Sequence, residues 1–481
     1  MGKYFSNFKV PHAFALLTFL ILVCSIASYV IPSGKYEKKI ITVGSSQKTV
    51  LVPGSFKYLP KKYEIKDLLI GNSLHEGYAT PVSILQFLTA IPKGMATGSA
   101  IIFFIFIVGG AFGILNETGT ITAILQSLIK KFAHKRKLLI ITVMIVTGLA
   151  GSCFGLGEEL LPLIPVFLLL SIRLGYDRMF GFCLVYLASS VGFAAATTNP
   201  FTLQVAQGIA GLPLCSGIIL RIIFFACAIS LLITYVLLYG KKIVNNHSVA
   251  LLGEEGFHMG DAEVKHTALN KRHVIVIITS LLIFAFLIYG TQAYGWFLNE
   301  MAGGFILVGI CAAIISKLSI EVTTRAFIKG LEGMVVAALV VGFATGLQVV
   351  LEEAQIIDTI IHSADVLLKG LSSYLAAIGM LVFQTVLNFF IPSGSGQAAV
   401  TMPLMAPLSD VLHVTRQTAV LAFTCGDGFS NAIIPTSGML MAALSIANIP
   451  YEKYFKFVFP IFIMMMFLSV IFLSIAVAIS Y

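Results

Sequence analysis

The sequence predicts an all-α polytopic membrane protein that contains two inverted copies of one unit broken by glycine and proline. Three observations support this fold class. Of 481 residues, 58% are hydrophobic and only 11% are charged, whereas about a quarter of the residues of a soluble domain are charged. The second half of the chain repeats the pattern of the first. Glycine, proline and small polar residues interrupt the apolar segments at matching places in the two halves.

Long apolar runs recur along the whole chain and predict helices that cross a bilayer, each of which needs about 17 to 25 residues. Clear examples lie at 13–31, 98–115, 138–154, 281–290, 334–351 and 457–480. We expect roughly ten to twelve spans, because unalternating runs indicate helices and only helices or closed barrels hide backbone polar groups from lipid. The run at 13–31 resembles a signal peptide, but it is long and lacks an A-x-A cleavage site, so we interpret it as the first span.

Two polar stretches, one from 33 to about 80 and one at 241–273, divide the chain into four predicted parts. These parts are an N-terminal transmembrane helix with a polar loop (1–89), a first repeat (90–240), a cytoplasmic loop with linking transmembrane helices (241–325) and a second repeat (326–481). Lysine and arginine cluster at 130–137 and 241–272. The positive-inside bias places both clusters, and therefore the N-terminus, in the cytoplasm.

The net charge of +9 does not indicate a nucleic-acid partner, because the basic residues lie in short clusters between apolar runs, as topology signals do. All seven cysteines lie in apolar stretches without a CxxC pair, and predict neither disulfides nor a metal site. No nucleophile, base and orienting group share a recognisable spacing, so we expect neither catalytic residues nor enzyme activity.

Comparison of the chain with itself reveals the repeat. Eight positions between 90 and 124 recur 236 residues later; after a two-residue shift, GLGEELLPLIP at 155–165 corresponds to SGSGQAAVTMP at 393–403, and ATTNPF at 196–201 to IPTSGM at 434–439. Lys93 follows a single span and should lie outside, whereas its equivalent Lys329 should lie inside. Equivalent positions on opposite sides predict an inverted repeat, an architecture that many secondary transporters use.

The first candidate site consists of Gly157, Glu158 and Glu159, which lie beside an apolar run. Ionisable side chains at membrane depth are costly and usually face a cavity or a pathway. An alternative is that the carboxylates mark a helix end at the lipid interface. The equivalent segment of the second copy is also polar and rich in glycine, which favours the functional interpretation.

That equivalent segment contains Ser393, Gly394, Ser395, Gly396 and Gln397, and prolines follow at 403 and 407. We expect this stretch not to form a continuous helix, so that its free amides and hydroxyls could bind a carboxylate or a dehydrated cation. A simple proline kink in a long helix is the alternative.

A second pair of matched patterns places hydroxyl and amide side chains beside a proline inside an apolar segment. A proline frees the carbonyl four residues earlier, so hydroxyl and carbonyl oxygens can converge there on a cation or on the polar end of a substrate. The candidate residues are Thr197, Thr198, Asn199 and Pro200 in the first copy and Pro435, Thr436 and Ser437 in the second.

Asp427 is the sharpest single signal, because it lies between two glycines within an apolar segment, with Asn431 one turn later. It could bind a coupling ion, carry a proton or pair with the ammonium group of a substrate. The alternative is a structural aspartate that caps a broken helix.

The strings GEELLPLIP, VGFAAATTNPFTLQVAQGIAGLPLCSG, NFFIPSGSGQAAVTMPLMAPLSD and FTCGDGFSNAIIPTSGMLMAALSIANIPYEKYFK resemble the YfcC-like group of the C4-dicarboxylate anaerobic carrier family. The resemblance implies ion-coupled transport by inverted repeats, each with a re-entrant helical hairpin (155–165 and 393–403) and a broken span. It also implies a multi-pass protein of the bacterial inner membrane, whose partners are the lipid bilayer and a small-molecule substrate.

The resemblance does not select one substrate class, since part of the wider family resembles dicarboxylate carriers and another part is similar to antiporters of basic amino acids. No basic residue occurs in the hairpin or break patterns, whereas Glu158, Glu159 and Asp427 lie in or near them. We therefore favour an antiporter for arginine- or ornithine-type substrates that works by alternating access. A C4-dicarboxylate carrier coupled to an ion is the alternative, and a channel or a membrane-embedded enzyme is more remote. We expect no cofactor; a coupling ion, Na+ or H+, and a homodimer stay open.

Overall fold

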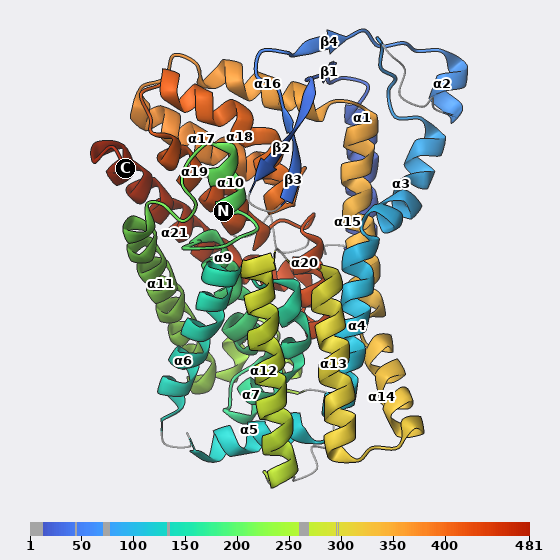
Figure 1. Ribbon diagram of the computed structural model, residues 1–481, viewed down its shortest axis with the longest axis vertical. Helices are drawn as coiled ribbons and strands as arrows, with labels where there is room; N and C mark the ends of the chain where they lie inside the picture. Colours follow the sequence, from blue (N-terminus) through green and yellow to red (C-terminus); the bar gives the residue numbers. More distant parts are fainter. Residues whose placement is uncertain are drawn as a thin grey trace.

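The computed structural model describes residues 13–43, 46–70, 77–131, 135–258, 269–294, 296 and 298–481. Six of the described helices are long and apolar enough to cross a membrane, and four shorter apolar helices accompany them. The predicted all-α multi-pass fold is therefore confirmed (Figure 1).

Helices follow one another in the same order in the two predicted copies, except that the continuous run from α8 to α9 in the first corresponds to the single helix α19 in the second. The first copy comprises α3 (Ile84–Thr97), α4 (Ser99–Glu117), α5 (Thr120–Lys131), α6 (Arg136–Leu149), α7 (Ile164–Arg173), α8 (Arg178–Phe182), α9 (Ala188–Ala194), α10 (Leu203–Ile209) and α11 (Ile218–Asn245). The second comprises α14 (Ile320–Glu332), α15 (Val335–Glu353), α16 (Ile357–Leu368), α17 (Ser373–Asn388), α18 (Gly394–Val411), α19 (Arg416–Asn431), α20 (Gly438–Ala447) and α21 (Tyr451–Ala478). Before the first copy lie α1 (Ala13–Ala27) and α2 (Ile65–Ile70), and α12 (Lys271–Tyr294) and α13 (Leu298–Ser316) link the copies.

Helix caps mark the same repeat at the level of single residues. Ser83 caps α3, and Ser319, 236 positions later, caps α14. Asp177 caps α8, and Thr415, 238 positions later, caps α19. These caps set where α3 and α14 begin. Positions 90 and 326, at which we expected the copies to start, therefore lie within these two helices.

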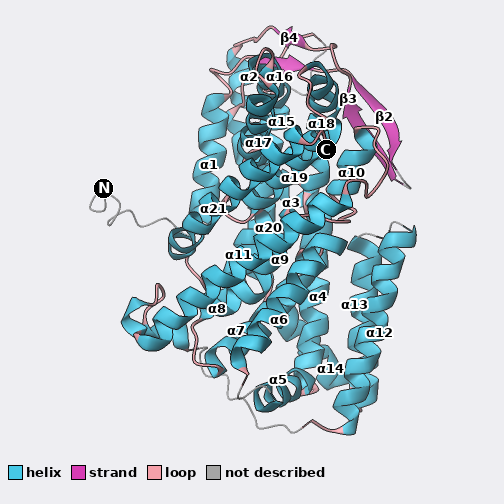
Figure 2. Ribbon diagram, turned by 90° about the vertical axis from the view of Figure 1, so that its left-hand side faces the viewer, coloured by secondary structure: helices cyan, strands magenta, loops and turns pink. Residues whose placement is uncertain are grey.

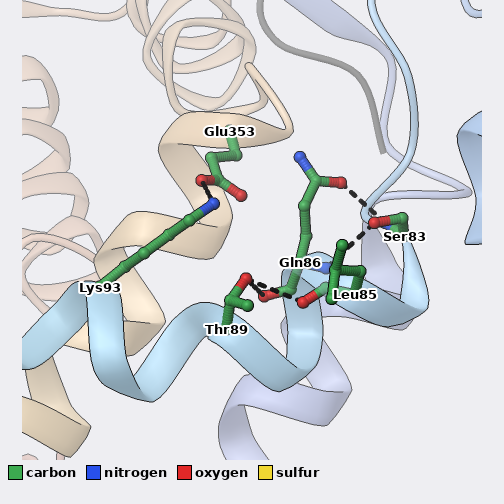
Figure 3. A network of polar contacts seen from close by, with 6 residues as sticks. All are labelled: Ser83, Leu85, Gln86, Thr89, Lys93 and Glu353. Atoms are coloured by element: carbon green, nitrogen blue, oxygen red, sulfur yellow. Dashed lines mark hydrogen bonds and ion pairs between the residues drawn. The ribbon is translucent and has the colours of Figure 1, made fainter. Parts of the chain in front are cut away.

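The copies pack on each other reciprocally, since α3 packs along α15 and α14 along α4. A Cβ at Gly94 would lie 2.3 Å from the backbone nitrogen of Gly346, and a Cβ at Gly330 would lie 2.2 Å from the carbonyl oxygen of Gly109. An ion pair between Lys93 of α3 and Glu353 of α15 joins the same elements (Figure 3). The equivalent helices α5 and α16 lie at opposite ends of the molecule (Figure 1), as two copies of opposite orientation would place them.

Each copy contains a helical hairpin that returns to the end where it began. In the first hairpin (α6 to α7), Arg136 donates to the carbonyl oxygen of Leu174 at 3.3 Å. In the second hairpin (α17 to α18), the hydroxyl of Ser373 donates to the carbonyl oxygen of Leu412 at 2.9 Å. The two contacts occupy equivalent places, so both segments form helical hairpins; that these hairpins are re-entrant in a membrane stays a prediction.

Four short strands form two antiparallel ribbons at one end of the molecule (Figure 2). β1 (Ser33–Lys35) pairs with β4 (Lys57–Leu59), and β2 (Lys38–Val43) pairs with β3 (Ser46–Leu51). The sequence indicated only a polar stretch here.

Candidate functional site

The first hairpin reverses through an irregular turn rather than a tight loop. α6 continues into a π-helical turn, Ala150–Phe154, and Gly155 then adopts a left-handed conformation with φ of 67°. A short 3-10 helix, Glu158–Leu163, leads into α7. The carboxylate Oε2 of Glu159 accepts a hydrogen bond from the backbone N–H of Gly157 at 2.9 Å, so Glu159 fixes the tip of the hairpin.

The first break, residues 195–202 between α9 and α10, is bonded to this hairpin tip. The backbone N–H of Thr197 donates to the carbonyl oxygen of Ser152 at 3.1 Å, and the hydroxyl of Thr198 donates to that of Cys153 at 2.9 Å. Asn199 is fully buried, and its Oδ1 accepts from the N–H of Phe201 at 2.8 Å. The backbone of Thr197 and the hydroxyl of Thr198 therefore hold the break against the hairpin.

In the second hairpin the chain is helical from Gly394 onward, which corrects our expectation that residues 393–407 would not form a continuous helix. α18 passes through both prolines, at 403 and 407. Ser393 caps the helix and accepts from the N–H of Gly396 at 3.3 Å. Gly394, Ser395 and Gly396 thus form the first turn, where backbone amides have no partner within the helix.

Gln397 points into the second hairpin, toward α17. It is fully buried, and its amide donates to the side-chain oxygen of Gln384 at 2.7 Å. Its role is therefore to join the two arms of this hairpin.

The second break, residues 432–437 between α19 and α20, contributes two hydroxyls. Ser437 caps α20 and accepts from the N–H of Leu440 at 3.4 Å. Thr436 is fully buried, and its hydroxyl has no hydrogen-bond partner among the described residues. Pro435 lies between α19 and α20 in the same break.

Asp427 lies inside α19, four residues before the helix ends at Asn431, so it does not cap a broken helix. Its side chain is fully buried. Oδ1 accepts from Asn431 at 3.4 Å, whereas Oδ2 has no hydrogen-bond partner in the described part of the chain. Oδ2 faces the first turn of α18, since a Cβ at Gly394 would lie 3.2 Å from it and 2.4 Å from the methyl carbon of Thr202.

Unpaired buried polar atoms concentrate around Asp427. Within the described residues, seven of the thirteen buried side-chain nitrogen and oxygen atoms without a hydrogen-bond partner belong to the hairpins, the first break, the second break or α19. They are Asn199 Nδ2, Thr202 Oγ1, Asn388 Oδ1, Gln397 Oε1, Asp427 Oδ2, Asn431 Oδ1 and Thr436 Oγ1. Buried polar groups usually have partners, and six of these seven are oxygens, so this region suits a cation.

A cavity of about 340 Å³ lies where the hairpins and the breaks meet, within the range of about 300 to 1,000 Å³ typical of small-molecule sites. The predicted residues that line it are Gly157, Glu159, Ser393, Gly394, Ser395, Asn431, Thr436 and Ser437. Those outside its lining are Thr197, Thr198, Asn199, Pro200, Gly396, Gln397, Asp427 and Pro435. The side chain of Glu158 is outside the described residues.

The wall of the cavity opposite the hairpins comes from residues that sequence reasoning missed. Thr97 and Gly98 lie at the junction of α3 and α4, and Thr345 and Gln348 project from α15. Thr202 of the first break also lines the cavity. Glu159 is the only charged side chain among the described residues that line the cavity.

One fully buried arginine, Arg221 on α11, was also missed. It lies among α11, α19 and the chain end, and its Nη1 donates to the hydroxyl of Thr424 at 3.4 Å. Arg221 is outside the cavity lining. The described lining of the cavity therefore presents a negative rather than a positive side chain.

Comparison with known proteins places the chain in one family. It matches the model of the DcuC family, C4-dicarboxylate anaerobic carrier, over residues 10–478. It is 33% identical over 474 residues to the Escherichia coli K12 protein named "Putative basic amino acid antiporter YfcC", covering 94% of this chain and 93% of the other. An uncharacterized protein of Haemophilus influenzae is 28% identical over 487 residues, with 95% of each chain covered.

Two solved structures of transporters are similar at lower identity. The YdaH transporter of Alcanivorax borkumensis has a TM-score of 0.46 at 14% identity, with 98% of this chain and 99% of the other covered. MtrF of Neisseria gonorrhoeae, described as illuminating a class of antimetabolite efflux pumps, has a TM-score of 0.44 at 17% identity, with 97% and 95% covered. The family match extends over nearly the whole chain, and this multi-pass membrane protein therefore belongs to the C4-dicarboxylate anaerobic carrier family of transporters.

Proposed function

We propose that this protein is a secondary active antiporter that exchanges basic amino acids of the arginine and ornithine type across the bacterial inner membrane by alternating access. The observation that carries the proposal is the cavity between the hairpins and α15, in which Glu159 is the charged side chain of the described lining. A carboxylate there favours a substrate that carries an ammonium or guanidinium group. The name of the Escherichia coli relative points the same way.

The two ends of an amino acid would bind at different places in the cavity. Its cationic side chain would pair with Glu159. Its carboxylate would lie at the first turn of α18, where Ser393, Gly394 and Ser395 line the cavity and free backbone amides, together with the helix dipole, favour an anion.

Asp427 has a separate role in this proposal, because Gly394 lies between its Oδ2 and the cavity. A buried carboxylate whose Oδ2 has no partner among the described residues, beside the equally unpaired oxygens of Asn388, Asn431 and Thr202, has the chemistry that binds Na+ or carries a proton. We assign Asp427 to a coupling ion and Glu159 to the substrate.

A C4-dicarboxylate carrier is the second candidate, and the description of the family favours it. A dicarboxylate has two anionic ends, one of which could bind at the first turn of α18. The other would meet Glu159 unless that carboxyl were protonated, and Arg221 lies outside the cavity lining. These contacts favour the basic amino acid.

Counterflow in proteoliposomes tests the choice. Vesicles loaded with unlabelled arginine or ornithine should accumulate labelled arginine, and vesicles loaded with succinate should not accumulate labelled succinate. Counterflow of succinate alone would establish the second candidate. Counterflow of neither, or a single-channel conductance, would overturn both.

A further inference from the structure

The β1–β4 ribbon is fastened to the end of α15 and to α16. The hydroxyl of Ser33 donates to the carbonyl oxygen of Ala354 at 2.8 Å, and the N–H of Gly34 donates to that of Gln355 at 2.9 Å. The N–H of Tyr36 donates to a carboxylate oxygen of Asp358 at 2.9 Å. This base is therefore part of the same body as α15, which forms one wall of the cavity.

The β2–β3 ribbon extends from that base onto α18 of the second hairpin and onto α10. β3 lies against α18 and β2 against α10 (Figure 1), so the ribbon contacts the second hairpin and the helix that follows the first break. At the root of β3, Leu51 is 1% exposed and belongs to one apolar cluster with Ile361 of α16 and Leu404 of α18. The root of the ribbon thus lies between α16 and α18, and the arm beyond this root contacts α18 and α10.

The contact between the ribbon base and α18 is incomplete. A cavity of about 320 Å³ lies there, with Tyr36, Phe56 and His362 on one side and Leu404 and Leu408 of α18 on the other. Protein interiors are otherwise closely packed, so separating these surfaces would break fewer contacts than separating two helices of the core.

We propose that the β2–β3 ribbon is a strap that holds the second hairpin against α16 in the conformation described here and must release α18 when the hairpins move relative to α15. The strap rests on the proposed alternating access, because without such movement there is nothing for it to hold. A two-stranded ribbon is only marginally stable alone, so β2–β3 depends on the surfaces it bridges. The separate pairing of β1 with β4 keeps the base anchored when the arm detaches.

The experiment shortens the arm and keeps its base. In the short-arm variant, residues 40–49 are replaced by Asn-Gly, which forms a tight hairpin turn directly after the Lys39–Val50 pair and leaves the Lys38–Leu51 pair intact. In the matched control only residues 44–45 are replaced by Asn-Gly, so the arm keeps its length. If the short-arm variant does not fold, replacing 42–47 after the Ile41–Lys48 pair gives an intermediate length.

The readout is the distance between spin labels at Leu367 of α16 and Val411 of α18, which are 78% and 71% exposed. Genetically encoded labels leave the seven cysteines in place. In lipid nanodiscs, the unchanged chain and the control should give one distance, and the short-arm variant should add a longer one. Identical distributions in all three would overturn the strap.

This measurement needs no substrate, so it is independent of the substrate assignment. Failure of arginine counterflow in the unchanged chain together with a longer distance in the short-arm variant would overturn the proposed substrate and support the strap. Arginine counterflow in the unchanged chain together with identical distances in all three proteins would support the proposed substrate and overturn the strap.

Discussion

Replacing Glu159 with glutamine should weaken the binding of arginine while the hairpin keeps its shape. Glutamine has nearly the same volume, and its amide oxygen can accept the hydrogen bond that the N–H of Gly157 donates to Glu159 at 2.9 Å. The substitution therefore removes the negative charge from the cavity and leaves the fixed hairpin tip in place.

The size of the effect follows from the surroundings of Glu159, which is half-buried. Opposite unit charges about 4 Å apart interact by about 4 kcal/mol at an effective dielectric constant of about 20. Because Glu159 is partly exposed, solvent screening reduces this to about 1 to 2 kcal/mol, between the contribution of an exposed ion pair and that of a hydrogen bond to a charged group. Because about 1.4 kcal/mol corresponds to a tenfold change, the Kd for arginine should rise about 5- to 30-fold.

Isothermal titration of the purified protein in nanodiscs measures the Kd, and counterflow gives the corresponding KM. Glu321→Gln is the matched control, because Glu321 lies on the surface of α14 in an ion pair with Arg325. This variant should bind arginine with the affinity of the unchanged protein. Unchanged arginine affinity in Glu159→Gln would refute the assignment of Glu159 to the substrate. A gain in succinate binding would favour the second candidate.

Asp427→Asn should abolish counterflow yet raise the melting temperature, because it removes a buried carboxylate that has no oppositely charged partner among the described residues. Counterflow at the normal rate would remove Asp427 from the site. Gly394→Ala should reduce counterflow at least tenfold, since its Cβ would lie 2.4 Å from the methyl carbon of Thr202. A Cβ at Gly303 would have no atom within 4 Å, so the control Gly303→Ala should leave transport intact. Equal transport rates in the two variants would contradict the close packing around Gly394. Burial raises the pKa of Asp358 at the ribbon base, so the folded state binds more protons there and thermal stability should fall as pH rises from about 4. Asp358→Asn should reduce the change of the melting temperature with pH. An unchanged slope of melting temperature against pH would contradict this role of Asp358.

The pattern of glycine, proline and hydroxyl residues predicted the breaks, because such residues interrupt apolar segments, and the family resemblance implied the hairpins. The same pattern misled at 393–407, where α18 continues through both prolines. The sequence could not predict the wall formed by Thr345 and Gln348, because single polar residues in an apolar helix do not reveal which neighbour they face. Asp427 illustrates the same limit. Its position between glycines marked it as functional, but only the packing of α18 on α19 places Gly394 between its carboxylate and the cavity.

The ribbon was missed for a different reason. β2 and β3 have six residues each and carry many charged and polar side chains, so their pattern resembles that of a solvated loop. They are strands because they pair with each other and rest on helices far away in the sequence. Local propensity does not include such neighbours.

The reciprocal packing of the copies also affects how the chain is made. The glycine face of α3 fits α15, and that of α4 fits α14, so the first copy finishes synthesis before its packing partners exist. Those partners are encoded roughly 240 residues later, a delay of about 12 to 50 seconds at ordinary rates of translation. During that interval these faces must rest against lipid or the insertion machinery. Assembly of the first half is therefore completed by the second half.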